Sequence, residues 1–301
     1  MELSNQEVHV EKQTNKQLKR AQGIRDFFDL ITQSKSVLFG GILVLIVVIC
    51  AIFAPIISTH DPYQMNMVDR LLKPLQKGHL LGTDQYGRDL FTRIIYGARV
   101  SLKVGMISVS LSMVIGVTLG LISGYYGGWL DSIIMRFVDI VLSFPVLLLA
   151  IALVAALGPG IENVILALGL VYWTNYARVV RANVLAIKEE EYIQAAKTIG
   201  SNDFRIIFYN ILPNCLAPVV VVATLGLGVA IVSEATLSFL GLGIQPPESS
   251  WGWTLAFGMK FIRESPHLSI YPGLAIMITV LGFNLLGDGI RDLTDSKLKR
   301  K

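Results

Sequence analysis

Hydrophobic residues in this chain are gathered into long runs, and polar residues are concentrated between them. Each run approaches the about 20 helical residues that cross the hydrocarbon core of a membrane. Helices are expected because lipid offers no partners to unpaired backbone groups. The pattern predicts an all-α, polytopic membrane protein with six transmembrane helices, at residues 38–57, 104–125, 137–157, 161–180, 215–238 and 270–287.

Polar stretches divide the chain around these helices. In the N-terminal tail, Ile24, Phe27, Phe28 and Ile31 have the spacing of an amphipathic helix on the membrane surface. The tail lacks the pattern of a cleaved signal peptide. The predicted units are the tail at 1–36, a first transmembrane helix at 37–58, an external segment at 59–99, a core of five helices at 100–290 with a polar loop at 189–213, and a basic tail at 291–301.

Basic residues predict the orientation of the chain. If the N-terminus is cytoplasmic, 17 Lys and Arg residues flank the inner side and 8 lie in the two outer loops. The positive-inside rule therefore places both termini and the 189–213 loop in the cytoplasm. Only 16% of residues are charged, well below a typical soluble domain. The net charge of +4 is explained by membrane-flanking basic residues, without a nucleic-acid partner.

The polar loop at 189–213 contains a short helical pattern. Tyr192, Ala195, Ala196 and Ile199 fall at i, i+3, i+4 and i+7, so they are expected on one helix face. The two alanines have short side chains, so another protein can approach the helix backbone on that face. Gly200 follows as the residue that ends the helix, where a positive φ costs glycine least.

Small residues recur every four positions along the second predicted transmembrane helix. Such a stripe allows close helix packing in lipid, against another helix of this chain or against a partner subunit. Its members are Ser108, Ser112, Gly116, Gly120 and Gly124. In the third predicted helix, Pro145 is expected to introduce a kink, which serves either architecture or motion.

Charged residues inside the predicted transmembrane helices are costly and usually face the bundle interior or a cavity. Arg136 and Asp139 are spaced to neutralise each other at i and i+3. Glu234 is the most isolated, and we expect it to face the pathway or a basic neighbour instead of lipid. Asp288 is expected at the membrane interface.

Catalytic and metal-binding signatures are missing from the sequence. It contains no Gly-Lys pair, so no nucleotide-hydrolase phosphate loop, and no Gly-x-Ser-x-Gly or His-Glu-x-x-His motif. Cys50 and Cys215 do not suggest a disulfide framework. His60, His79 and His267 fall on the predicted outer side without ligand spacing. We therefore expect no enzymatic activity, cofactor or metal in this chain.

Several segments resemble one transporter family. Gln194-Ala195-Ala196, three residues and Gly200, followed by Ile211-Leu212-Pro213, resemble the Glu-Ala-Ala loop of membrane subunits of ATP-binding-cassette (ABC) importers, with Gln in place of the first Glu. HLLGTDQYGRDL at 79–90, GARVSL at 97–102, EATLSFLGLG at 234–243 and NLLGD at 284–288 resemble the dipeptide, oligopeptide and nickel branch. The chain is most similar to the C-type permease of that branch.

This resemblance implies the fold and function of a type I ABC importer permease in the bacterial cytoplasmic membrane. It implies a second homologous permease, two ATP-binding subunits that bind ATP and Mg²⁺, and an extracytoplasmic substrate-binding protein. Peptides are the expected cargo, with nickel, glutathione or another small solute as alternatives. The residues expected to couple this chain to the ATPase are Glu191, Tyr192, Gln194, Ala195, Ala196, Ile199, Gly200, Arg205 and Pro213.

The external segment has two interpretations. Asp84, Arg88 and Asp89 either offer a contact surface to the binding protein or satisfy one another within a structural loop. A different function, a self-contained secondary carrier or channel, would predict inverted internal repeats, and none is evident. A structural or sensory scaffold would tolerate changes at Ala195 and Ala196.

Overall fold

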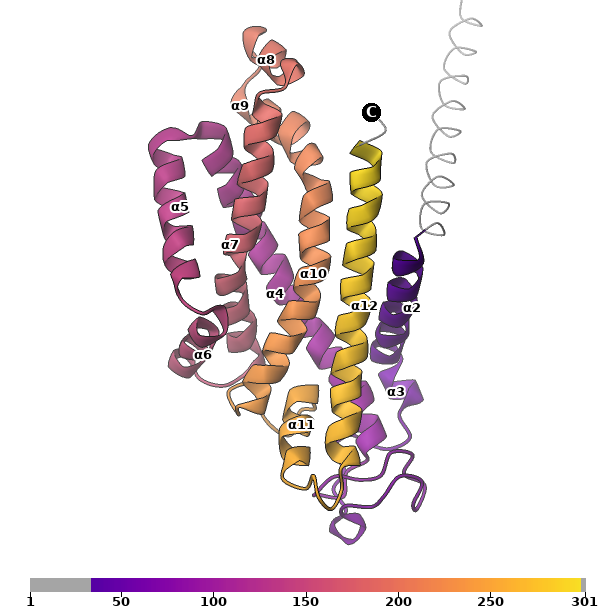
Figure 1. Cartoon of the computed structure of the whole chain (residues 1–301). Helices are drawn as coiled ribbons and strands as arrows, with labels where there is room; N and C mark the ends of the chain where they lie inside the picture. The colour runs from indigo at the N-terminus through magenta and orange to yellow at the C-terminus, as the bar shows by residue number, and fades with distance from the viewer. Residues whose placement is uncertain (1–33, 299–301) are drawn as a thin grey trace, which may run out of the picture.

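The computed structural model describes residues 34–298, and the side chains of residues 34–294 (Figure 1). This part of the chain is predominantly helical and contains no strand, which confirms the all-α prediction. The α-helices are α2 (Lys35–Ile52), α3 (Ala54–Ile57), α4 (Leu90–Tyr126), α5 (Gly128–Ser143), α6 (Val146–Leu157), α7 (Ile161–Lys188), α8 (Glu191–Thr198), α9 (Asp203–Arg205), α10 (Leu212–Phe239), α11 (Trp251–Met259) and α12 (His267–Leu298). A 3-10 turn, η1, covers Met67–Asp69, and a π-helical stretch, η2, covers Ile206–Ile211. The amphipathic helix expected near residue 24 lies outside the described residues.

Four helical segments are long and apolar enough to cross a membrane: α2, α4, α12 and the continuous stretch Asp203–Phe239 that ends in α10. Helices extend beyond the predicted limits. Residues 90–99 were assigned to the external segment but form the first turns of α4, because the Asp89 side chain caps that helix at the Thr92 N–H (2.8 Å). α12 likewise continues to Leu298, through most of the predicted basic tail.

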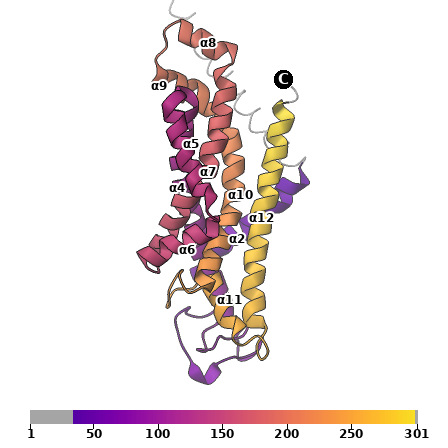
Figure 2. The ribbon, with the colours of Figure 1, turned by 60° about the vertical axis from the view of Figure 1, so that its left-hand side comes forward.

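The third predicted transmembrane helix is two helices. α5 and α6 meet at a bend of 90°, and α6 lies across the bundle (Figure 2). Pro145 disfavours the helical conformation of the residue before it, and Phe144 is accordingly extended (φ −93, ψ 143). The predicted kink is therefore a break. With the bent pair counted as one span, the described residues hold five candidate spans, and α7 is not among them.

The bundle has two distinct ends. α8 and the C-terminal end of α12 lie at one end, whereas residues 59–89 and α11 lie at the other (Figure 1). The shared end of α8 and α12 agrees with the charge pattern, which predicts the 189–213 loop and the C-terminal tail on one side.

The stripe of small residues packs against α7 of the same chain. Ser112 Oγ donates a hydrogen bond to the Gly169 carbonyl at 3.0 Å. At Gly116, an added Cβ would lie 2.4 Å from the Trp173 carbonyl oxygen, so only glycine permits this approach of the two helices. All five members are buried: Ser108, Ser112, Gly116, Gly120 and Gly124. The stripe is thus an internal contact between α4 and α7, which decides between the two partners left open by the sequence.

Candidate functional site

α8 protrudes at one end of the bundle, and its fully buried residue is Ile193. Ile193 belongs to an apolar cluster with Ile206 and Ile211 of η2. Sequence periodicity did not single out Ile193, because one buried position in a two-turn helix leaves no repeat to detect. This contact packs the protruding helix α8 firmly against η2 and α10.

The outer face of α8 carries most of the predicted residues. Tyr192 and Ile199 expose 48% and 83% of their surface, and Ala195 between them is also exposed. Ala196 differs from the prediction. It is half-buried and packs against the cluster around Ile193, because it is the member of the predicted face nearest to Ile193 around the helix. The accessible low surface is therefore centred on Ala195.

Gly200 ends α8 as predicted. Its φ of +78 lies in the left-handed region. Its N–H donates to the Lys197 carbonyl (2.9 Å), and the Ser201 N–H donates to the Ala196 carbonyl (3.0 Å), the pair of bonds that defines a Schellman motif. No neighbouring atom would obstruct a side chain there, so the requirement for glycine comes from the backbone conformation.

Polar contacts link α8 to the adjacent ends of α7, α4 and α9. Gln194 Nε2 donates to the Lys188 carbonyl at the end of α7 (2.9 Å). Lys188 Nζ in turn donates to the Tyr125 carbonyl in α4 (2.7 Å), and the Tyr125 hydroxyl donates to Asp203 in α9 (2.6 Å). These bonds connect α8 to both α7 and α4.

The remaining predicted residues of this loop have plain structural positions. Glu191 is exposed in the first turn of α8, where a carboxylate interacts favourably with the helix dipole. Arg205 is exposed at the end of α9. Pro213 lies in the first turn of α10, directly after the π-helical stretch η2.

Three exposed aromatic residues beside α8 were missed in the sequence. Phe204, Phe208 and Tyr209 expose about half or more of their surfaces, and the rings of Phe204 and Phe208 lie 4.4 Å apart. The available signal was their clustering within six positions of a polar loop. Exposed aromatic groups of this kind are typical of protein contacts. We name the exposed set Tyr192, Ala195, Ile199, Phe204, Phe208 and Tyr209 the docking face.

The charges of α5 pair differently from the prediction. Asp139 accepts a hydrogen bond from Arg178 of α7 at 2.7 Å, and not from Arg136, whose side chain is exposed. A second pair, unnoticed in the sequence, joins Asp131 to Arg181 through two bonds of 2.5 and 2.6 Å. Both pairs tie α5 to α7 across about 40 to 50 residues of chain, a separation that helical spacing rules do not address.

Glu234 lies inside the bundle, as expected, with no exposed surface. Its partners are hydroxyl groups instead of a basic residue or an open pathway. Ser101 of α4 donates to Oε2 (2.9 Å), and Ser238 of α10 donates to Oε1 (2.7 Å). Ser250, the cap of α11, also hydrogen-bonds to it. Glu234 therefore joins three helices. Asp288, the last predicted intramembrane charge, is exposed on α12.

Replacing Glu234 with alanine is expected to destabilise the bundle. The change leaves buried serine hydroxyls without their acceptor, at about 1–3 kcal/mol for each unsatisfied group. A lower melting temperature of the purified protein in detergent would show this. Glu234→Gln keeps the shape and one acceptor oxygen and should lose less. Equal melting temperatures for wild-type protein and Glu234→Ala would contradict the structural role.

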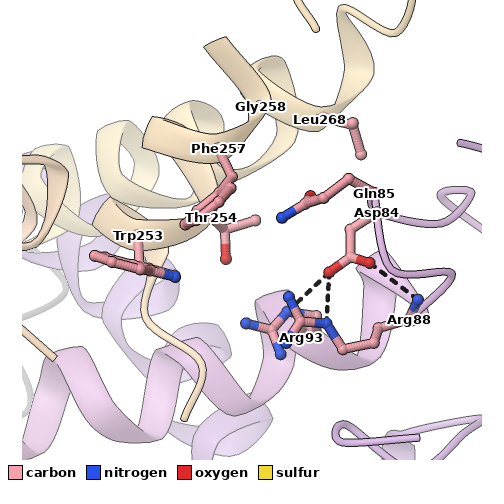
Figure 3. A pocket seen from close by; sticks show the side chains of 9 residues that line it. All are labelled: Asp84, Gln85, Arg88, Arg93, Trp253, Thr254, Phe257, Gly258 and Leu268. Carbon is pink, nitrogen blue, oxygen red and sulfur yellow. Dashed lines mark hydrogen bonds and ion pairs between the residues drawn. The ribbon is translucent and has the colours of Figure 1, made fainter. Parts of the chain in front are cut away.

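The external residues Asp84, Arg88 and Asp89 are buried, with 4%, 3% and 2% of their surfaces exposed. Asp84 accepts a hydrogen bond from Arg88 Nε (2.7 Å) and also lies 3.7 Å from Arg93 Nε (Figure 3). Their burial favours the second of the two interpretations, a structural loop whose charged groups satisfy one another. The buried guanidinium groups of Arg88 and Arg93 share the Asp84 carboxylate, so these charges are neutralised within the protein.

This cluster borders a small hollow between the external segment and α11. Trp253 and Phe257 of α11 form its opposite side, with Gln85 directed into it (Figure 3). The Asp84 cluster therefore lies where the external segment packs against α11.

Comparison with known proteins identifies relatives along nearly the whole chain. The family described as binding-protein-dependent transport system inner membrane component matches residues 116–300, and the N-terminal TM domain of oligopeptide transport permease C matches residues 24–74. A dipeptide transport system permease protein of Alkalihalophilus pseudofirmus is 47% identical over 91% of this chain and 90% of its own length. A glutathione transport system permease protein of Pectobacterium atrosepticum is 43% identical, with coverage of 91% for both chains.

Solved structures support the fold. An inward-facing structure of the MetNI methionine ABC transporter matches with a TM-score of 0.55 and 19% identity, over 68% of this chain and 97% of the other. At this identity the likeness concerns architecture alone.

Proposed function

Because this chain belongs to the family of binding-protein-dependent transport system inner membrane components, we propose that it forms half of a pathway for peptides across the bacterial cytoplasmic membrane. Members of this family are membrane subunits of ABC importers, which work with an ATPase and a substrate-binding protein. This membership sets aside the self-contained carrier and the scaffold. The proposed assembly contains this chain, a second homologous permease, two ATP-binding subunits and an extracytoplasmic binding protein. ATP and Mg²⁺ are bound by the ATP-binding subunits.

The docking face is the observation that supports the coupling role. α8 presents Tyr192, Ala195 and Ile199 to the outside and is fastened to the bundle through Ile193. A short rigid helix with a low, apolar outer face suits insertion into a groove of an ATPase subunit. Movement of that subunit would reach α4 and α7 through the contacts of Lys188 and Tyr125. In the proposed assembly, the docking face and both ends of the chain lie in the cytoplasm.

Peptide cargo is supported by the names of the relatives, which include dipeptide and di/tripeptide permeases. The test is uptake of a labelled dipeptide by cells that lack their own peptide importers and express this chain with its partner subunits. We expect uptake that competes with unlabelled di- and tripeptides and stops when this chain is omitted. Uptake of glutathione or Ni²⁺ instead would show that the cargo is one of the alternatives and not a peptide. ATP-independent uptake by this chain alone would refute the importer assignment.

A further inference from the structure

Two histidines and an aspartate that are distant in sequence meet at the external end of the bundle. His60 follows α3, His79 lies in the external segment, and Asp89 immediately precedes α4. His79 Nδ1 lies 2.8 Å from Asp89 Oδ1, and His60 Nδ1 lies 3.7 Å from the same oxygen. The sequence showed no ligand spacing because intervals of 19 and 10 residues fit no short metal-binding motif.

The donor atoms converge on one point. The imidazole rings of His60 and His79 are stacked, with centroids 4.4 Å apart and planes inclined by 25°. One ligand atom from each of the three residues lies within 4.8 Å of the others. Ligands of a tetrahedral zinc ion, at about 2.0–2.2 Å from the metal, are separated from one another by somewhat more than 3 Å. Coordination of one ion by all three therefore requires the His79–Asp89 hydrogen bond to open and the stacked rings to turn apart.

The surrounding contacts hold these ligands in place. Asp89 Oδ2 accepts the N–H of Thr92, which leaves Oδ1 directed toward the two imidazoles. The His60 N–H donates to the Thr92 hydroxyl at 3.4 Å, so the backbone of His60 is attached to the same turn of α4. Such outer contacts orient ligands toward a bound metal.

We propose that His60, His79 and Asp89 form a binding site for a divalent transition-metal cation of the zinc class, on the external side of the protein. Two imidazole nitrogens and one carboxylate oxygen favour Zn²⁺, Ni²⁺ or Cu²⁺ over Ca²⁺ and Mg²⁺, which prefer oxygen ligands. His60 is partly exposed, with 34% of its side chain accessible, so the cation enters from the external solution and keeps a position for water. Bound metal would tie the end of α3, the external segment and the start of α4 together.

The competing arrangement is a set of hydrogen bonds without metal. In it, His79 donates to Asp89, and the Thr59 hydroxyl, 2.9 Å from His60 Nδ1, donates to that nitrogen. The Asp89 carboxylate and the Nδ1 atoms of both histidines then have internal partners. This arrangement predicts that added Zn²⁺ has no effect that depends on His60, which separates it from the metal site.

Titration of the purified protein with Zn²⁺ after chelator treatment tests the site. We expect saturable binding by calorimetry at low micromolar Zn²⁺ or tighter, and a higher melting temperature on binding. His60→Ala should weaken binding at least about tenfold, because it removes a ligand. His60 is the safest ligand to change, since its side chain is partly exposed.

His267→Ala is the matched control, because His267 lies at the same end of the bundle but outside the cluster. It should bind Zn²⁺ like the wild-type protein. The proposal is overturned if the wild-type protein binds no Zn²⁺ below about 100 μM, or if His60→Ala binds as tightly as wild type. Both readouts are independent of transport, so their failure would leave the importer assignment untouched.

Discussion

Replacing the exposed Ala195 with glutamate is expected to reduce ATP-driven uptake at least about tenfold while the chain still folds. Ala195 lies on the docking face between Tyr192 and Ile199, with no internal contact to lose. In the assembled importer, the new carboxylate would be buried against the ATPase without a partner, which is strongly unfavourable. A loss of about 1.4 kcal/mol in docking free energy already weakens the complex tenfold. Uptake of labelled peptide and co-purification of the ATP-binding subunit measure both effects.

Ala195→Ser is the matched control, because it changes the same position but keeps the side chain small and uncharged. Uptake should stay near the wild-type level. Ala196→Glu is less informative, since Ala196 packs against the cluster around Ile193 and its replacement also disturbs the seat of α8. Normal uptake by Ala195→Glu with its ATPase retained would show that the docking face is not where the ATPase binds. An equal loss in Ala195→Ser would show that the loss does not come from the buried charge.

Much of the fold follows from hydropathy alone, because each membrane helix must satisfy its backbone internally and needs a long apolar run. Hydropathy does not predict where a helix begins or how sharply it bends, because these depend on capping side chains and on neighbouring helices. The start of α4 depends on the Asp89 cap, and a capping side chain can extend a helix well beyond the apolar run that predicts it. Pro145 predicted a kink, but the 90° angle between α5 and α6 depends on the neighbouring helices, which the sequence of this segment does not describe.

Sites were predictable to the extent that they rest on short-range spacing. The termination of α8 at Gly200 requires only local backbone geometry and was confirmed. Partners across the fold were not predictable. Asp139 was assigned to Arg136, three residues away, but pairs with Arg178 of α7. The burial of Asp84 among arginines likewise depends on the external segment folding back onto α4 and α11.

Replacing Gly116 with alanine should destabilise the bundle strongly, despite alanine's better helix propensity. The added Cβ would lie 2.4 Å from the Trp173 carbonyl oxygen and 2.5 Å from Tyr176 Cβ, so α4 and α7 must separate along their contact. Overpacking typically costs about 1–3 kcal/mol, and alanine returns only about 1 kcal/mol of helix propensity. Because the obstructing atoms include the backbone of α7, which cannot rotate away, we expect a cost near the upper end of the overpacking range. A melting temperature several degrees below wild type, and less protein in the membrane, are the expected results.

Gly41→Ala provides the matched control. Gly41 lies in α2, and an added Cβ there would meet no atom within 4 Å. The same methyl group should therefore leave the melting temperature unchanged or raise it slightly through helix propensity. Comparison of the two variants separates the effect of close packing from the general effect of removing a glycine. A similar change in both, or an unaltered Gly116→Ala protein, would mean that α4 and α7 do not depend on this approach for their stability.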